Sequence, residues 1–115
     1  MSNAQLSQRT KYFDKHLNKP KYMPLIEYII TSNKNKFTYD EFKLFSGNSI
    51  NEDELDIILR KMYSCNLISH KTNSNNLYKR IPITGKFRNE LMQLDNPSLN
   101  NILKEGMNID SVYSN

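Results

Sequence analysis

The side chains best suited to bind an anion flank a short polar segment in the second half of the chain. They are His70 and Lys71 before the segment, Asn73 and Asn75 within it, and Lys79 and Arg80 after it. Amino and guanidinium groups contact phosphate oxygens, and small polar side chains at a hairpin tip can enter the minor groove of duplex DNA. The alternative interpretation of the same residues is an ordinary solvated hairpin.

Basic charge is unevenly distributed along the 115 residues. The formal net charge is +4 and the pI is about 9.2. Residues 1–36 carry +5, residues 37–69 carry −3, residues 70–90 carry +4 and the remainder carries −2. Because cations attract nucleic acid through the release of counterions, the N-terminal segment and the hairpin are the better candidates for contact with an anionic partner.

A group of carboxylates lies between these two basic segments. Glu52, Asp53 and Glu54 follow Asn51 directly, and Asp56 comes two residues later. Carboxylates in the first turn of a helix favour the helix dipole and fit a capping role. They also accept hydrogen bonds from cytosine, but they repel phosphates, so a DNA-bound state would need its attraction from the hairpin and the N-terminal segment.

Two helices are predicted before residue 37. The first spans residues 4–18 and ends at Lys19-Pro20. Its apolar face consists of Leu6, Thr10, Phe13 and Leu17. Its basic side chains fit either an arm that contacts nucleic acid or a packing helix with a solvated face. Pro24 suits the first turn of the second helix, which is apolar on most sides and therefore central, and residues 32–36 form a polar turn.

Two capped helices are predicted next, separated by a turn at Gly47. Thr38 and Glu41 fit a capping box before a short helix that buries Phe42 and Phe45. The longer helix spans about residues 51–65, and two overlapping capping boxes, Ser49 with Glu52 and Asn51 with Glu54, leave its start open. Its apolar stripe consists of Leu55, Ile58, Leu59 and Met62. Asn66 follows at the place where a left-handed C-cap is expected.

A β-hairpin and two helices are predicted to complete the chain. The hairpin strands lie in residues 67–72 and 77–83, with Tyr78 and Arg80 on the face opposite Lys79. Thr84 is expected to cap the next helix. The last helix is expected to begin at Asn96-Pro97 and to stop at Gly106.

These elements predict one domain that is mainly α with a small β-hairpin. Its predicted parts are a basic N-terminal helix or arm (1–22), a core (23–83), C-terminal helices (84–106) and a tail (107–115). The single cysteine, Cys65, excludes an intrachain disulfide and is expected to be a buried structural thiol.

The sequence indicates neither an enzyme nor a cofactor. His16 and His70 lie far apart with no carboxylate at metal-ligand spacing, and the chain lacks a glycine-rich phosphate loop and a spacing typical of a nucleophile with its base. No apolar run approaches the ~20 residues of a membrane-spanning helix, and no signal peptide is recognisable, so a cytoplasmic location is expected.

From about residue 23 to residue 94 the pattern resembles the winged helix-turn-helix transcription regulators of the MarR and ArsR kind. Leu59-Arg60-Lys61-Met62, then Asn66-Leu67-Ile68, and later Ile83-Thr84-Gly85-Lys86-Phe87-Arg88 occupy the places of the family's motifs. Asn66 replaces the usual glycine, and asparagine also tolerates a positive φ. The resemblance implies a homodimer in which the helix from Asn51 lies in the major groove.

The sequence therefore predicts a small DNA-binding transcription regulator. Its predicted DNA contacts are Thr38, Lys43, Ser49, Asn51, Arg60, Lys61, His70, Lys71, Asn73, Asn75, Lys79 and Arg80. The alternative prediction is a winged-helix interaction module, such as a phage or plasmid adaptor, that binds a basic protein through Glu52, Asp53 and Asp56. Both fit because winged helices serve nucleic-acid and protein recognition alike.

Overall fold

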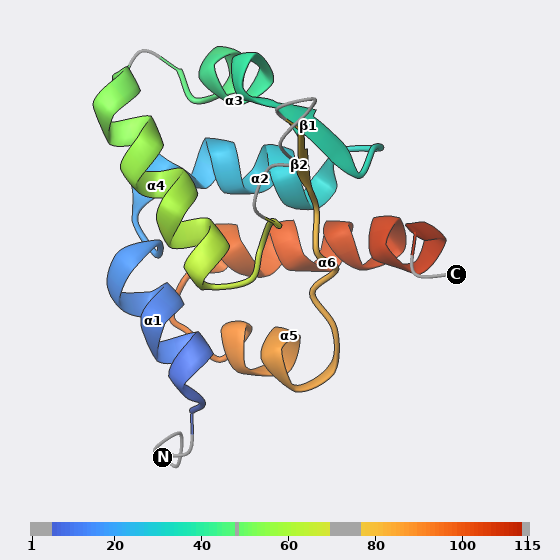
Figure 1. Cartoon of the computed structure of the whole chain (residues 1–115). Coiled ribbons are helices and arrows are strands. Elements are labelled where there is room, and N and C mark those ends of the chain that lie inside the picture. The colour runs from blue at the N-terminus through green and yellow to red at the C-terminus, as the bar shows by residue number, and fades with distance from the viewer. Residues whose placement is uncertain (1–5, 48, 70–76, 114–115) are drawn as a thin grey trace.

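The computed structural model of the chain describes residues 6–47, 49–69 and 77–113. Its helices are α1 (Gln8–His16), α2 (Met23–Thr31), α3 (Tyr39–Phe45), α4 (Glu52–Ser64), α5 (Gly85–Leu91) and α6 (Pro97–Tyr113), with a 3₁₀ turn, η2 (Pro20–Tyr22), before α2. Its strands are β1 (Lys36–Thr38) and β2 (Leu77–Lys79). The fold is mainly helical with a small antiparallel sheet, as predicted, and this arrangement is compatible with a winged helix (Figure 1).

Local caps determine where the central helices begin and end. The Thr38 hydroxyl accepts from Glu41 N at 3.1 Å, and the Glu41 carboxylate accepts from Thr38 N at 2.8 Å, which confirms the capping box. Asn51 Oδ1 accepts from Glu54 N at 2.8 Å and sets the start of α4. Asn66 adopts a φ of 59° after α4, as predicted.

The core is built around α2. Four of its apolar residues, Leu25, Ile26, Ile29 and Ile30, are buried, because α6 runs along one side of α2 while α3 and the sheet lie on another (Figure 1). The predicted apolar face of α1 is also confirmed, with Thr10, Phe13 and Leu17 at 0 % exposure. Among the described residues, no helix is long and apolar enough to cross a membrane.

Gly106 lies inside α6 and does not end it. The helix continues to Tyr113, so the predicted stop and the predicted tail from residue 107 are wrong. A Cβ at position 106 would overlap Ile30 Cγ2 and would lie 3.1 Å from the Ile30 carbonyl oxygen. Glycine is therefore required here by the close approach of α6 to α2.

The sheet differs from the predicted hairpin. Strand β2 pairs with β1 in the register Lys36↔Lys79, Phe37↔Tyr78 and Thr38↔Leu77, whereas the sequence predicts a polar turn up to residue 36. Residues 67–69 contribute an isolated bridge from Ile68 to Arg80, and Ser69 N donates to Lys79 O. The predicted tip, residues 70–76, lies outside the described residues.

Two aromatic residues show how the sheet and α3 meet the core. Phe37 and Tyr78 face inward from β1 and β2, and both rings contact Phe42 of α3. Phe45, predicted to be buried, is 46 % exposed. Its ring stacks on that of Tyr28, with the two centroids 4.1 Å apart, at the edge of the core.

Candidate functional site

The carboxylates at the start of α4 have partners on neighbouring elements. Glu52 forms an ion pair with Lys43 of α3. Glu54 forms an ion pair with Lys21 Nζ at 3.0 Å and accepts from the Tyr22 hydroxyl at 3.4 Å. Exposed pairs of this kind contribute little stability, about 0–1 kcal/mol. These ion pairs offset part of the negative charge at the start of α4, which would otherwise repel phosphates.

Asp56 is tied to the preceding helix. Its carboxylate accepts from the hydroxyl of Tyr39. Burial of the phenol, this hydrogen bond and the charge of Asp56 together raise the pKa of Tyr39 to about 12. The phenol therefore stays protonated and keeps donating to Asp56, which leaves Asp53 as the more open carboxylate of the predicted protein-binding set.

The predicted DNA contacts on α3 and α4 differ in their freedom to bind. Thr38 and Asn51 use their side-chain oxygens as helix caps, so the Thr38 hydroxyl hydrogen and the Asn51 amide hydrogens are their remaining donors. Ser49 and Arg60 are exposed, and Lys61 is half-buried. Of these, the two basic residues lie in the C-terminal half of α4, away from its acidic start.

Arg80 is a structural residue, and its prediction as a DNA contact is wrong. Its side chain is 4 % exposed, and Nη1 donates to the carbonyl oxygens of Ile29 at 3.0 Å, Ile30 at 2.9 Å and Ser32 at 3.1 Å. The last carbonyls of a helix lack intrahelical partners, and a cation is favourable at that end. Tyr78 and Arg80 therefore occupy the inner face of the strand, not its solvent face.

Arg9 binds the end of α4 in a similar way. Its Nε donates to Cys65 O at 2.8 Å and its Nη2 to Asn66 O at 2.7 Å, while the guanidinium lies 3.7 Å from the centre of the Phe87 ring. The thiol of Cys65 is buried as predicted, and burial raises its pKa to about 11. The thiol is therefore protonated at neutral pH and is structural.

The sheet places two lysines opposite each other on its outward face. Lys36 and Lys79 are cross-strand partners, and both side chains are exposed. Like charges in directly opposite positions destabilise a sheet. Sequence reasoning found Lys79 but missed Lys36, because it missed β1; the polar-apolar-polar alternation of Lys36-Phe37-Thr38 was the available signal. His70, Lys71, Asn73 and Asn75 lie outside the described residues.

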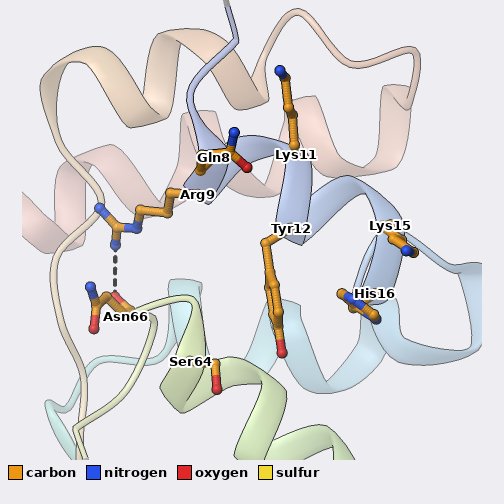
Figure 2. A pocket seen from close by; sticks show the side chains of 8 residues that line it. All are labelled: Gln8, Arg9, Lys11, Tyr12, Lys15, His16, Ser64 and Asn66. Carbon is orange, nitrogen blue, oxygen red and sulfur yellow. Dashed lines mark hydrogen bonds between the residues drawn. The ribbon is translucent and has the colours of Figure 1, made fainter.

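A cleft of about 540 Å³ separates α1 from the end of α4 (Figure 2). Helix α1 contributes Gln8, Lys11, Tyr12, Lys15 and His16 to its lining, in addition to Arg9, and the other side contributes Ser64 and Asn66. None of these lining residues carries a carboxylate. The sequence offered the basic face of α1 as either an arm or the solvated face of a packing helix, and in the structure Arg9 contacts the end of α4 while Lys11 and Lys15 are exposed.

Comparison with models of known protein families, with curated proteins and with solved structures gives no match. The described part of the chain contains no group of three or more His, Cys, Asp or Glu side chains that could hold a metal ion.

Proposed function

We propose that the protein binds duplex DNA and holds its phosphates with the lysines of the sheet and the basic half of α4. The observation that carries this proposal is the exposed pair of Lys36 and Lys79. The repulsion between these like charges in directly opposite positions destabilises the sheet. A phosphate placed between the two amino groups would remove this repulsion and release counterions.

The surroundings of α4 support the same proposal. Lys43 and Lys21 offset Glu52 and Glu54, so the acidic helix start is less repulsive than the sequence suggests. Arg60 and Lys61 stand on the other half of the helix. In this proposal Lys36 joins the set of DNA contacts, and Arg80 leaves it.

The test is a salt titration of binding to random duplex DNA, using wild type and a variant with Lys36→Gln and Lys79→Gln. Each neutralised phosphate adds about 0.9 to the magnitude of the slope of log K against log salt, so removing both lysines from one shared phosphate should reduce that magnitude by about 0.9. The loss of affinity should be similar for all DNA sequences, because phosphate contacts carry no sequence information.

A variant with Lys86→Gln and Lys104→Gln is the matched control, since it removes the same charge from exposed positions on α5 and α6. Its slope should stay close to that of wild type. Equal slopes for all three proteins, or no salt-dependent binding by wild type, would rule out the proposal.

A second candidate function is docking of a basic protein on the helix-turn-helix. Its specific support is the exposure of apolar side chains on α3 and α4, where Leu44 is 74 % exposed and Ile57 is 47 % exposed, beside the open carboxylate of Asp53. Asp53→Lys separates the two candidates. It should increase affinity for duplex DNA if α4 faces phosphates, and it should weaken capture of a basic partner if α4 is a docking surface.

A further inference from the structure

The α1–α4 cleft is lined by two lysines, Lys11 and Lys15, and Lys61 of α4 is near enough to act on His16 in its lining. Elsewhere, lysines 21, 34, 43 and 86 lie within ion-pair distance of glutamates. No such pair in the described ranges involves Lys11, Lys15 or Lys61. A cleft lined by cations without carboxylates attracts anions, because its walls focus the positive field.

The environment of His16 is also rich in positive charge. It lies in the lining of the cleft, half-buried, and its pKa is lowered by burial and then by the positive charges of Lys61, Lys15 and Lys19. Lys61 belongs to α4 and the other two lie on or just after α1, so positive charges from both sides of the chain act on the histidine. An anion bound among them would offset this field.

The cleft also has an aromatic wall. Tyr12 extends from α1 toward the end of α4 near Ser64 (Figure 2), and its ring centre lies 4.5 Å from that of His16, at an angle of 45°. Tyr12 is half-buried, so part of its ring remains open. Aromatic side chains beside cations bind nucleotides by stacking on the base while the cations contact the phosphate.

The walls of the cleft are firmly held. Arg9 joins α1 to the carbonyls of Cys65 and Asn66, and Figure 2 shows its bond to Asn66 beside the cleft. Its guanidinium is used in these contacts, so it fixes the distance between the walls while the lysines remain open. A volume of about 540 Å³ lies within the ~300–1,000 Å³ typical of small-molecule sites.

We propose that this cleft binds a nucleotide, with its phosphate at Lys11 and Lys15 and its base against Tyr12. The site is separate from the lysine pair of the sheet and goes beyond the proposed binding of duplex DNA. The nucleotide is either a free mononucleotide or the phosphorylated end of a nucleic-acid strand, because both present the same chemistry.

The experiment is a calorimetric titration of the full chain with AMP, with inorganic phosphate and with a short single-stranded oligonucleotide that carries a 5′ phosphate. The same oligonucleotide without the phosphate is the comparison ligand. We expect saturable binding of AMP or of the phosphorylated oligonucleotide, and weaker binding of phosphate alone. Binding of AMP identifies a free nucleotide as a ligand, whereas binding of the phosphorylated oligonucleotide alone identifies a strand end.

Two variants test the assigned contacts. Lys11→Gln with Lys15→Gln should lower the affinity for the ligand about tenfold or more, as expected for lost charge-assisted hydrogen bonds. The same variant should keep the wild-type midpoint of urea denaturation, because both side chains are exposed. Tyr12→Leu should lower the affinity for the nucleotide but not the affinity for inorganic phosphate. The Lys86→Gln, Lys104→Gln variant is the charge-matched control.

A second readout is the NMR titration of His16, whose pKa should rise when the ligand saturates the cleft. The proposal is overturned if neither AMP nor the phosphorylated oligonucleotide binds, or if the Lys11, Lys15 variant binds as wild type does. Loss of duplex binding in the Lys36, Lys79 variant with intact nucleotide binding would separate the two sites. Intact nucleotide binding in a protein that does not bind duplex DNA would refute the proposed function and leave this site standing.

Discussion

The C-terminal end of α2 and the cleft between α1 and α4 both concentrate positive charge, but they use it differently. At α2, the guanidinium of Arg80 is buried and meets three backbone carbonyls. In the cleft, Lys11 and Lys15 are exposed, and no lining residue is acidic. The planar arginine fork matches fixed acceptors, whereas the hydrated ammonium group of lysine stays in solvent. The first charge therefore stabilises the fold, and the second is open to a ligand.

Arg9 shares features with both regions. It lines the cleft, yet its donors bind the carbonyls of Cys65 and Asn66. Chemically it resembles Arg80, because both neutralise a helix C-terminus. The guanidinium groups of Arg9 and Arg80 are therefore occupied by backbone carbonyls, whereas Lys11 and Lys15 keep their ammonium groups exposed.

The largest expected effect comes from Arg80→Ala. The substitution leaves the carbonyls of Ile29, Ile30 and Ser32 without this donor inside the protein, so the free energy of unfolding should fall by about 2–4 kcal/mol. Urea denaturation measures the change. Arg60→Ala, at an exposed arginine of α4, is the control and should change stability by less than about 0.5 kcal/mol. A similar small change for Arg80→Ala would break the distinction between the two regions.

The next effect concerns the contact of α6 with the same end of α2. Gly106→Ala places a Cβ against Ile30 Cγ2 and its carbonyl oxygen, and overpacking of this kind costs about 1–3 kcal/mol. Asn101→Ala lies on an exposed position of α6 and controls for the helix propensity of alanine. Thermal unfolding of the two variants should separate them, and equal melting temperatures would contradict the close approach of the helices.

The smallest effect at neutral pH is expected for Glu90→Gln, which tests how the cleft wall is held. Glu90 Oε1 accepts from Thr10 Oγ1 at 2.6 Å, Ser7 N at 2.8 Å and Ser7 Oγ at 2.9 Å. These hydrogen bonds, the one from Thr10 first, hold the pKa of Glu90 at about 2, below the ordinary 4.5. The stabilisation is therefore complete above about pH 4.5 and is lost as the pH falls toward 2.

Urea denaturation between pH 7 and pH 2 measures this dependence. Glu90→Gln should be less stable than wild type at pH 7, and its stability should fall less steeply as the medium becomes acidic. Asp14→Asn, at an exposed position of α1, is the control and should follow the wild-type profile. Identical profiles for Glu90→Gln and wild type would show that the carboxylate does not hold α1 through its charge.

Local chemistry made much of the fold predictable. Thr38 and Glu41 form the capping box that their spacing predicts, Asn51 caps α4, and Asn66 takes the left-handed conformation. The apolar stripe of α4 is buried as predicted, with Leu55, Ile58, Leu59 and Met62 all below 5 % exposure. Each of these features depends on residues within one or two turns of each other, so the sequence pattern contains the necessary information.

The site was less predictable, because its geometry depends on distant partners. Strand β1 is three residues long and becomes a strand through pairing with β2, about forty residues later in the chain. Because β1 was not predicted, Lys36 was not recognised as a surface residue of the sheet, and Arg80 was expected to contact DNA although its side chain is buried. The α1–α4 cleft likewise joins residues 8–16 to residues 64 and 66, and no spacing in the sequence relates them.

The sequence by itself determined the helix boundaries set by caps, the buried stripes and the segments rich in positive charge. The tertiary structure decided what each charge does: Arg80 and Arg9 bind helix ends, Lys36 and Lys79 share a strand register, and Lys11 and Lys15 line a cleft. The physical reason is range. Caps and amphipathic faces arise from neighbouring residues, whereas the partner of a charge is whichever group the packed chain places beside it.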